Sequence, residues 1–329
     1  ELKGTESEVK NLIRHVTLST LKSYKKKYGK EYGELVICCD GRKYWRKEIY
    51  EHYKAGRKKM REASELDWTL IFDTLSEMRD DIAKHFPWRV IHVERAEADD
   101  IIARWIALHP QDDHVIISSD SDYVQLIAPN VRQYNGITDE LITLEGYFNA
   151  KDQPITDKKT KQPKTCPDPQ WLLFEKCMRG DTSDNVFSAY PGVREKGTKN
   201  KVGLREAFAD RERKGYSWNN MMLQRWTDHN GEEHRVLDDY ERNRTLIDLT
   251  AQPESVKVKV DQAIVEQISH KDVGQVGVHF MRFCGKFELN KLSETAESIS
   301  RWLNETYKGV LDDSSQTSDR QTVLDPQAG

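Results

Sequence analysis

Short apolar runs that end in aspartate constrain the fold of this sequence more than any other feature. Leu35 to Cys39 is a continuous apolar run followed by Asp40, and His114 to Ser119 is a second run followed by Asp120. A third run, Arg89 to Val93, lies between them. Apolar runs of this length are typical of buried parallel strands. The sequence therefore predicts three such strands, two of which end in an acidic residue.

Helical patterns alternate with these strands. Amphipathic periodicity covers Thr5 to Tyr28, Leu70 to Lys84 and Ala96 to His109. Strands that alternate with helices predict an α/β layer fold, with a central, mostly parallel sheet flanked by helices. In such sheets ligands bind at the carboxyl ends of the strands, where the two aspartates stand.

The second half of the chain has a different pattern. Tyr147 to Pro167 is rich in Lys, Thr and Pro and is predicted to be a surface hairpin or loop. Asp168-Pro169 begins a helix through Met178, and further helical segments run to about Tyr307. Asp312 to Gly329 is polar and is predicted to be a disordered tail. We therefore expect a core at 1–180, a helical C-terminal domain at 181–310 and a tail at 311–329.

Charge is sorted along the chain. The formal net charge is −4, which by itself argues against a nucleic-acid partner. Between Arg42 and Arg61, however, nine Lys and Arg residues stand against two Glu. An acidic site beside a basic segment suits a metal-dependent enzyme that acts on a polyanion. No apolar stretch approaches the roughly 20 residues of a membrane span, and the five cysteines show no metal-binding or disulfide spacing.

Acidic residues gather in four short clusters. They are Asp40; Glu97, Asp99 and Asp100; Asp120 and Asp122; and Asp181 and Asp184. Each cluster alone is as well explained by a turn or a helix cap, but their joint order along an α/β chain favours one site. Two like charges 4 Å apart repel by about 4 kcal/mol at an effective dielectric of 20, so converging carboxylates would recruit cations. All-oxygen ligands suit Mg²⁺ or Mn²⁺.

These clusters resemble the signature of the 5′-nuclease (flap endonuclease) superfamily, which has a PIN-like fold. The matching phrases are Val36-Ile-Cys-Cys-Asp40, Glu97-Ala-Asp-Asp100, Ile117-Ser-Ser-Asp-Ser-Asp122 and Arg179-Gly-Asp-Thr-Ser-Asp-Asn-Val186. The ribonuclease H branch of T-even phages is the most similar, on Tyr44-Trp45-Arg46, Tyr53-Lys54 with Arg57, and Glu241-Arg-Asn-Arg-Thr-Leu-Ile-Asp248. The resemblance extends from Glu1 to about Leu303.

The resemblance implies two Mg²⁺ ions, with Mn²⁺ as a substitute. It assigns the first ion to Asp40, Glu97, Asp99 and Asp120. It assigns the second ion to Asp122, Asp181 and Asp184, largely through water, and gives Asp100 a supporting role for both. Asp120 is also expected to be catalytic, because it holds the ion at which the phosphate is attacked.

The basic segment at about 42–68 would form a helical arch beside the 5′ single strand. Lys54 and Arg57 are then expected to be catalytic electrophiles that stabilise charge on the phosphate. Tyr53 is expected to stack on a base near the cut. The other nucleic-acid contacts expected in the arch are Arg42, Lys43 and Arg46. The alternative interpretation of this segment is a solvated basic helix with a few surface aromatics.

A helix-hairpin-helix-like element is expected after the second metal motif. Tyr190-Pro-Gly-Val193 fits it, and its expected contacts with a duplex backbone are Gly192, Val193, Gly197, Lys199 and Lys201. The resemblance adds a K⁺ ion at this element. A plain Pro-Gly turn between two helices is the alternative.

The superfamily also places a metal-binding Asp on a strand ahead of the helix that opens this chain. No residue of the chain supplies it, so we expect that the natural N-terminal strand is missing. The leading hypothesis is a 5′→3′ exonuclease and flap endonuclease that removes RNA primers and 5′ flaps from DNA. A non-catalytic binder of branched DNA and a PIN-type endoribonuclease remain as alternatives.

The resemblance also implies a setting for this activity. The substrates would be RNA–DNA hybrid and duplex DNA with a 5′ end or flap, during DNA replication. A single-strand-binding protein and a sliding clamp are the implied protein partners. The protein is expected to be a monomer in the cytoplasm of a phage-infected bacterial cell.

Overall fold

The computed structural model describes residues 4–268 and 275–303, in two compact units. The first unit joins residues 1–39, 63–92 and 262–329, and the second joins residues 40–62 and 93–261. The predicted tail at 311–329 and the end of the helical pattern at Tyr307 lie outside the described residues. In the described ranges, no helix combines the length and the apolar character that crossing a membrane requires.

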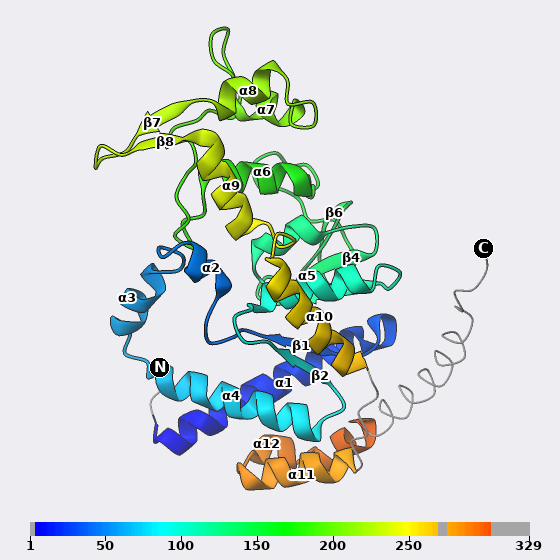
Figure 1. The fold of residues 1–329 in the computed structure, drawn as a ribbon. Coiled ribbons are helices and arrows are strands. Elements are labelled where there is room, and N and C mark those ends of the chain that lie inside the picture. Colours follow the sequence, from blue (N-terminus) through cyan, green and yellow to red (C-terminus); the bar gives the residue numbers. More distant parts are fainter. Residues whose placement is uncertain (1–3, 269–274, 304–329) are drawn as a thin grey trace, which may run out of the picture. The chain divides into compact units, whose positions relative to one another are not determined.

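The first unit is a small parallel sheet with helices beside it (Figure 1). Its strands β1 (Val36–Cys39) and β2 (Arg89–His92) pair in parallel, with Val36 opposite Arg89. The helices of this unit are α1 (Glu6–Tyr32), α4 (Trp68–His85), α11 (Val276–Lys286) and α12 (Asn290–Ser293). Leu18, Met78, Phe86 and Phe280 belong to the apolar cluster that joins these helices to β2. Thr5 caps α1 through the predicted capping box with Glu8.

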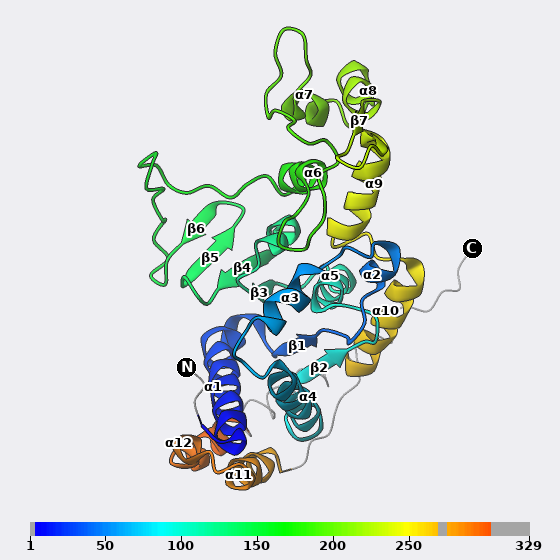
Figure 2. The same cartoon turned by 90° about the vertical axis from the view of Figure 1, so that its left-hand side faces the viewer.

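The second unit contains a four-stranded sheet. It consists of β3 (His114–Ile117), β4 (Val131–Asn135), β5 (Glu140–Thr143) and β6 (Gly146–Phe148), in that order. Figure 2 shows the four strands side by side. The pair β3–β4 is parallel, whereas β4–β5 and β5–β6 are antiparallel. The predicted α/β class and parallel strands are confirmed, and an antiparallel extension is added to them.

Short helices of the second unit carry most of the polar side chains discussed below. They are α2 (Trp45–Ile49), α3 (Gly56–Glu62), α5 (Ala98–Leu108), the 3₁₀ helix η1 (Ser121–Leu126), α6 (Pro169–Arg179), α7 (Leu204–Ala209), α8 (Tyr216–Met222) and α9 (Val236–Ile247). The hairpin of β7 (Arg225–Thr227) and β8 (Glu233–Arg235) precedes α9. The helix α10 (Glu254–Ile268) runs across the division between the two units.

The predicted boundary between 180 and 181 falls within the second compact unit. Trp171, Phe174 and Met178 of α6 pack in one apolar cluster with Leu204 and Val236, which come from the other side of that boundary. Burial of a shared apolar cluster keeps these helices in one unit. The helical pattern of the sequence contains no information about this packing, because periodicity marks the buried face of a helix and not its partner.

Candidate functional site

Carboxylates from distant segments converge in the second unit. Asp99, Asp122, Asp181 and Asp184 line one pocket, together with Arg46 and Tyr53. Val186, Leu246, Ile247 and Leu249 form its apolar side. The four carboxylates come from α5, from η1 and from the turn after α6. The pocket therefore depends on the tertiary fold rather than on any single motif.

The other four predicted carboxylates are connected to this pocket through hydrogen bonds. Asp40 Oδ1 accepts from the backbone N–H of Ala98 at 2.8 Å, beside Asp99. Asp120 Oδ1 accepts from the N–H of Asp122 at 2.9 Å. Both bonds use the free N–H groups of a helix start, where an acidic side chain is favourable. Glu97 and Asp100 are reached through Arg46, which pairs with both.

Three lysine and arginine side chains pair with the carboxylates at the pocket. Lys54 Nζ lies 2.5 Å from Glu97 Oε1 and 3.6 Å from Asp184 Oδ2. Arg57 pairs with Asp184 Oδ1 at 2.8 Å. Lys176 pairs with Asp122, and with Asp181 at 3.1 Å. With Arg46, four cations face eight carboxylates, so the ionised cluster keeps an excess of four negative charges.

Burial and these ion pairs shift the pKa values of the carboxyl groups in opposite directions. Burial raises the pKa of Asp99 to about 6, although Tyr123 donates a hydrogen bond to it. Burial also raises the pKa of Asp122. Burial opposes ionisation of Glu97 as well, but the charges of Arg46 and Lys54 outweigh it, and the pKa of Glu97 is lowered. Burial thus dominates the pKa values of Asp99 and Asp122, whereas the neighbouring cations dominate that of Glu97.

The turn that follows α6 places Asp181 and Asp184. Gly180 has φ +79°, and a side chain there would meet the carbonyl oxygen of Val186, so only glycine fits. The backbone of Asp181 pairs with Val186 in both directions. The Ser183 hydroxyl and N–H donate to Asp181 Oδ1 at 2.6 and 2.8 Å. These contacts fix one carboxylate oxygen and leave the other, Oδ2, facing Lys176.

The basic loop before α3 is fastened to the same turn. Lys54 has φ +54°, a left-handed conformation that is uncommon for a residue with a side chain. Its N–H donates to the carbonyl of Asp184 at 2.8 Å, while Asn185 Nδ2 donates to the carbonyl of His52 at 2.8 Å. Backbone strain of this kind persists where the surroundings impose it, often at functional sites.

The structure buries three residues that are expected to contact the ions or the nucleic acid. Arg46 is 1 % exposed and its guanidinium bonds Glu97, Asp100 and the carbonyl of Leu246, so it has no surface to offer a phosphate. Tyr53 is 2 % exposed, and its hydroxyl donates to Glu97 and Asp184, so its ring cannot stack on a base in this conformation.

Asp100 is the third of these buried residues. It is fully buried, and its two oxygens accept from Trp45 Nε1, from Arg46 and from the N–H of Glu97. A carboxylate with its lone pairs already occupied is a poor direct ligand for an ion. Its contacts instead hold Arg46 and the start of α5 in place.

Lys176 was missed by the sequence interpretation. It stands five residues before Asp181 on α6, and its ammonium lies against two carboxylates that the resemblance assigns to the second ion. Burial opposes its charge, but Asp122 and Asp181 outweigh this and raise the pKa of Lys176. The signal available in the sequence was the position of Lys176, five residues before Asp181 of the acidic motif.

The remaining expected nucleic-acid contacts lie at the surface. Arg42, Lys43 and Arg57 are exposed in the basic segment, and Lys199 and Lys201 are exposed in the loop between α6 and α7. In that loop, a side chain at Gly197 would meet the carbonyl oxygen of Lys201 at 2.6 Å. Gly192 has φ +71°, and Val193 is half-buried. The loop is thus a tight glycine-dependent turn with lysines on its outside.

Known proteins are similar to parts of this chain. Residues 3–156 match the family described as 5′-3′ exonuclease, N-terminal resolvase-like domain. The ribonuclease H of Enterobacteria phage T4 is 29 % identical over 184 residues, which are 54 % of this chain and 54 % of that protein. A flap endonuclease Xni of Shewanella loihica is 31 % identical over 105 residues, 31 % of this chain and 37 % of that protein. The matches thus span about half or less of these relatives.

A solved structure supports the fold. The T5 D15 protein, crystallised with metal ions, superposes with a TM-score of 0.51 at 18 % identity, over 77 % of this chain and 91 % of that one. The expected PIN-like, resolvase-type fold is thereby confirmed. Residues 3–156, whose fold helps to build the acidic pocket, are thus similar to the N-terminal resolvase-like domain of 5′-3′ exonucleases.

Proposed function

We propose that this protein is a divalent-metal-dependent 5′-nuclease that hydrolyses phosphodiester bonds near 5′ ends and 5′ flaps of DNA, including RNA primers. The observation that carries the proposal is the pocket in which Asp99, Asp122, Asp181 and Asp184 converge, with Lys54 and Arg57 beside it. The names of the phage and bacterial relatives support the same class of substrate.

The donor set fits Mg²⁺. Every acidic group at the pocket offers carboxylate oxygen, which is the ligand type that Mg²⁺ and Mn²⁺ prefer. The excess of negative charge also favours a divalent cation. Asp40, Glu97, Asp99 and Asp120 would hold one ion, and Asp122, Asp181 and Asp184 would hold a second. When bound, such ions lower the pKa of a water and stabilise the leaving oxygen of the phosphodiester.

The cationic side chains would bind and orient the phosphate. Arg57 is exposed on α3, so its guanidinium can turn from Asp184 to a phosphate oxygen. Lys54 is held beside the pocket by its backbone hydrogen bond to Asp184, so its ammonium needs no large movement to reach the same group. Donors that are already in place stabilise the charge of the transition state most effectively. Lys176 would balance Asp122 and Asp181 until the substrate and ions are bound.

The exposed lysines of the loop 190–203 would hold the duplex. Lys199 and Lys201 are exposed and would neutralise backbone phosphates, and the glycines would let the chain approach these phosphates closely. A K⁺ ion at this loop is part of the proposal, as are contacts with a single-strand-binding protein and a sliding clamp during replication in an infected cell.

A cleavage assay tests the proposal. A 5′-labelled RNA primer and a 5′-labelled flap, each annealed to DNA, are incubated with the 329-residue chain in Mg²⁺ or in EDTA. The chain is also assayed with an added N-terminal strand that carries the aspartate expected from the resemblance. Short 5′ products that require Mg²⁺ are expected, and their lengths separate stepwise degradation from flap cutting.

Matched variants decide whether the pocket is responsible. Asp181→Asn should abolish cleavage, while Asp112→Asn, at an exposed loop position, should not change it. If both forms of the chain bind the flap tightly and cut nothing in Mg²⁺, the protein is a binder of branched DNA and not a nuclease. Cleavage of free single-stranded RNA alone would instead identify an endoribonuclease.

A further inference from the structure

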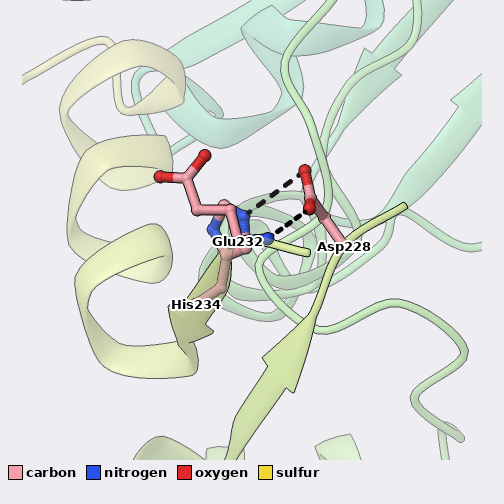
Figure 3. Close-up of side chains that lie close together, drawn as sticks. All are labelled: Asp228, Glu232 and His234. Atoms are coloured by element: carbon pink, nitrogen blue, oxygen red, sulfur yellow. Dashed lines mark hydrogen bonds and ion pairs between the residues drawn. The ribbon is translucent and has the colours of Figure 1, made fainter. Parts of the chain in front are cut away.

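The β7–β8 hairpin carries a second group of metal-ligating side chains. Asp228, Glu232 and His234 each offer one ligand atom, and the three atoms lie within 4.8 Å of one another. Figure 3 shows the Asp228 carboxylate and the His234 imidazole facing each other, with Glu232 beside the imidazole. None of these residues lines the acidic pocket or belongs to the motifs discussed above.

The surroundings of His234 prepare one ring nitrogen to bind a ligand. Its ring stacks on Trp226, the residue opposite it in the hairpin, at 4.4 Å between centroids. Nδ1 lies 3.1 Å from Asp239 Oδ2, although the two atoms are not aligned as a hydrogen bond. A carboxylate beside the ring nitrogen that does not bind the ion is the usual support of a metal-bound imidazole. A proton on Nδ1, the nitrogen that faces Asp239, leaves the lone pair on Nε2.

The Nε2 atom is buried, and among the described residues it has no hydrogen-bond partner. Asp228 Oδ2 lies 4.0 Å away, which is too far for a hydrogen bond. A buried nitrogen without a partner is costly and calls for an explanation, such as a bound ion. The atom points into the cluster, since Asp228 is on that side of the ring.

The turn of the hairpin holds Asp228 in place. Its Oδ1 accepts from the N–H groups of Asn230 and Glu232 at 2.9 and 2.8 Å, so Oδ2 is the oxygen that faces His234. A tetrahedral zinc ion with ligand bonds of about 2.0–2.2 Å requires its ligand atoms to lie roughly 3.4 Å apart. Asp228 and His234, whose ligand atoms lie 4.0 Å apart, therefore need to approach by about 0.6 Å. The ligand atoms of the whole group lie within 4.8 Å, so the others need to approach by at most about 1.4 Å, which a rotamer change of the exposed Glu232 can supply.

We propose that Asp228, Glu232 and His234 form a metal site for an ion of intermediate softness such as Zn²⁺. The ion would link the turn of the hairpin to β8. One imidazole and two carboxylates suit Zn²⁺, whereas Mg²⁺ prefers oxygen ligands alone. Water would complete the coordination on the exposed side of Glu232. This site is independent of the proposed nuclease activity.

Zinc binding to the intact chain tests the proposal. The chain is stripped of metal, an excess of Mg²⁺ is added to occupy the acidic pocket, and Zn²⁺ is titrated in competition with a chromophoric chelator. We expect Zn²⁺ binding that Mg²⁺ does not displace. We also expect quenching when the probe is Cu²⁺, because the bound ion would lie next to the indole of Trp226; Trp226→Phe should remove this quenching.

Variants on the same hairpin locate the ion. His234→Ala and Glu232→Gln should each weaken Zn²⁺ binding by at least about tenfold. His229→Ala, an exposed histidine in the same turn, should leave it unchanged. Glu232→Gln is not expected to disturb folding, because the side chain is exposed, so a loss of Zn²⁺ binding in this variant reports on the site itself. The proposal is overturned if Mg²⁺ displaces all the Zn²⁺, if no Zn²⁺ binds, or if Glu232→Gln and His234→Ala bind it as the parent chain does.

Discussion

The backbone N–H of Lys54 donates a hydrogen bond of 2.8 Å to the carbonyl of Asp184. This contact joins the backbone of a basic residue to the backbone of an acidic residue 130 positions further along the chain, and Lys54 is left-handed there. Asn185 Nδ2 donates back to the carbonyl of His52, so the basic loop and the turn after α6 are joined by hydrogen bonds in both directions. The ammonium of Lys54 lies 2.5 Å from Glu97 Oε1 and 3.6 Å from Asp184 Oδ2, so its charge is already held at the carboxylates. Charges held in place before the reaction stabilise a transition state most effectively.

Replacement of Lys54 tests this role. Lys54→Met keeps the length of the side chain and removes its charge, so we expect kcat to fall by about 10²–10³ while the Kd for the flap substrate changes little. The measurement is single-turnover cleavage, with Kd determined separately in Ca²⁺. Lys58→Met, at an exposed position on α3, is the control and should cleave normally. An equal loss of kcat in both variants would mean that Lys54 contributes only general electrostatic attraction of the substrate.

Lys176 is expected to stabilise the metal-free protein. Without its ammonium, Asp122 and Asp181 lose their partner, so Lys176→Met should lower the free energy of unfolding in EDTA by about 1–3 kcal/mol. Mg²⁺ should restore much of the loss, because an ion would compensate the same carboxylates. Thermal melts in EDTA and in Mg²⁺ measure both effects, and Lys159→Met, on the exposed 149–164 loop, is the control. A loss that Mg²⁺ leaves unchanged would contradict this account.

Asp99 is expected to destabilise the metal-free fold near neutral pH. Its pKa rises from 3.8 to about 6, so the folded state binds a proton more tightly than the unfolded state does. The penalty is absent below pH 3.8, grows between pH 3.8 and 6, and is complete above pH 6. Asp99→Asn removes it and should stabilise the protein at pH 7 by up to roughly 3 kcal/mol, an upper limit because the group is partly solvated.

The pH dependence separates this effect from a general change. Melts of Asp99→Asn and of the parent chain in EDTA should converge as the pH falls toward 4 and diverge as it rises. Asp120→Asn, at an exposed position, should show a much smaller difference. A constant offset at every pH would show that ionisation of Asp99 is not the cause.

Gly180 is expected to be indispensable for the turn that carries Asp181. Gly180→Ala combines a positive φ with a clash against the carbonyl of Val186, so it should cost clearly more than the ~1 kcal/mol of an ordinary alanine at positive φ. Gly33→Ala has a similar φ of +80° with no atom within 4 Å and provides the matched comparison. Equal losses of stability in urea unfolding would mean that the turn relaxes around the added methyl group.

Arg46 is expected to act on stability rather than on DNA. Arg46→Ala leaves Glu97 and Asp100 buried without their partner and should cost about 3–5 kcal/mol. The Kd for duplex DNA, corrected for the folded fraction, should stay the same. If Arg46→Ala is stable but binds DNA weakly, the result would support the contact between Arg46 and a phosphate that the sequence predicts.

The sequence by itself determined the local features of this protein. The capping box at Thr5, the helix start at Asp168-Pro169 and the strand at Val36–Cys39 each depend on a few neighbouring residues, so composition and spacing were sufficient to predict them. The order of the acidic motifs along the chain also predicted which carboxylates belong to one site. Local hydrogen bonding and periodicity act over one or two turns of chain, which is the range that a sequence pattern covers.

Only the tertiary structure decided what surrounds each charge. Arg46, Tyr53 and Asp100 look like surface or ligand groups in the sequence, yet packing buries all three, and the cost of burial makes them partners of one another and of Glu97. Lys176 meets Asp122 across 54 positions, and Lys54 meets Glu97 across 43. A motif specifies the sign of a charge, but desolvation and partners separated along the chain are set by the folded environment, and these determine what the charge can do.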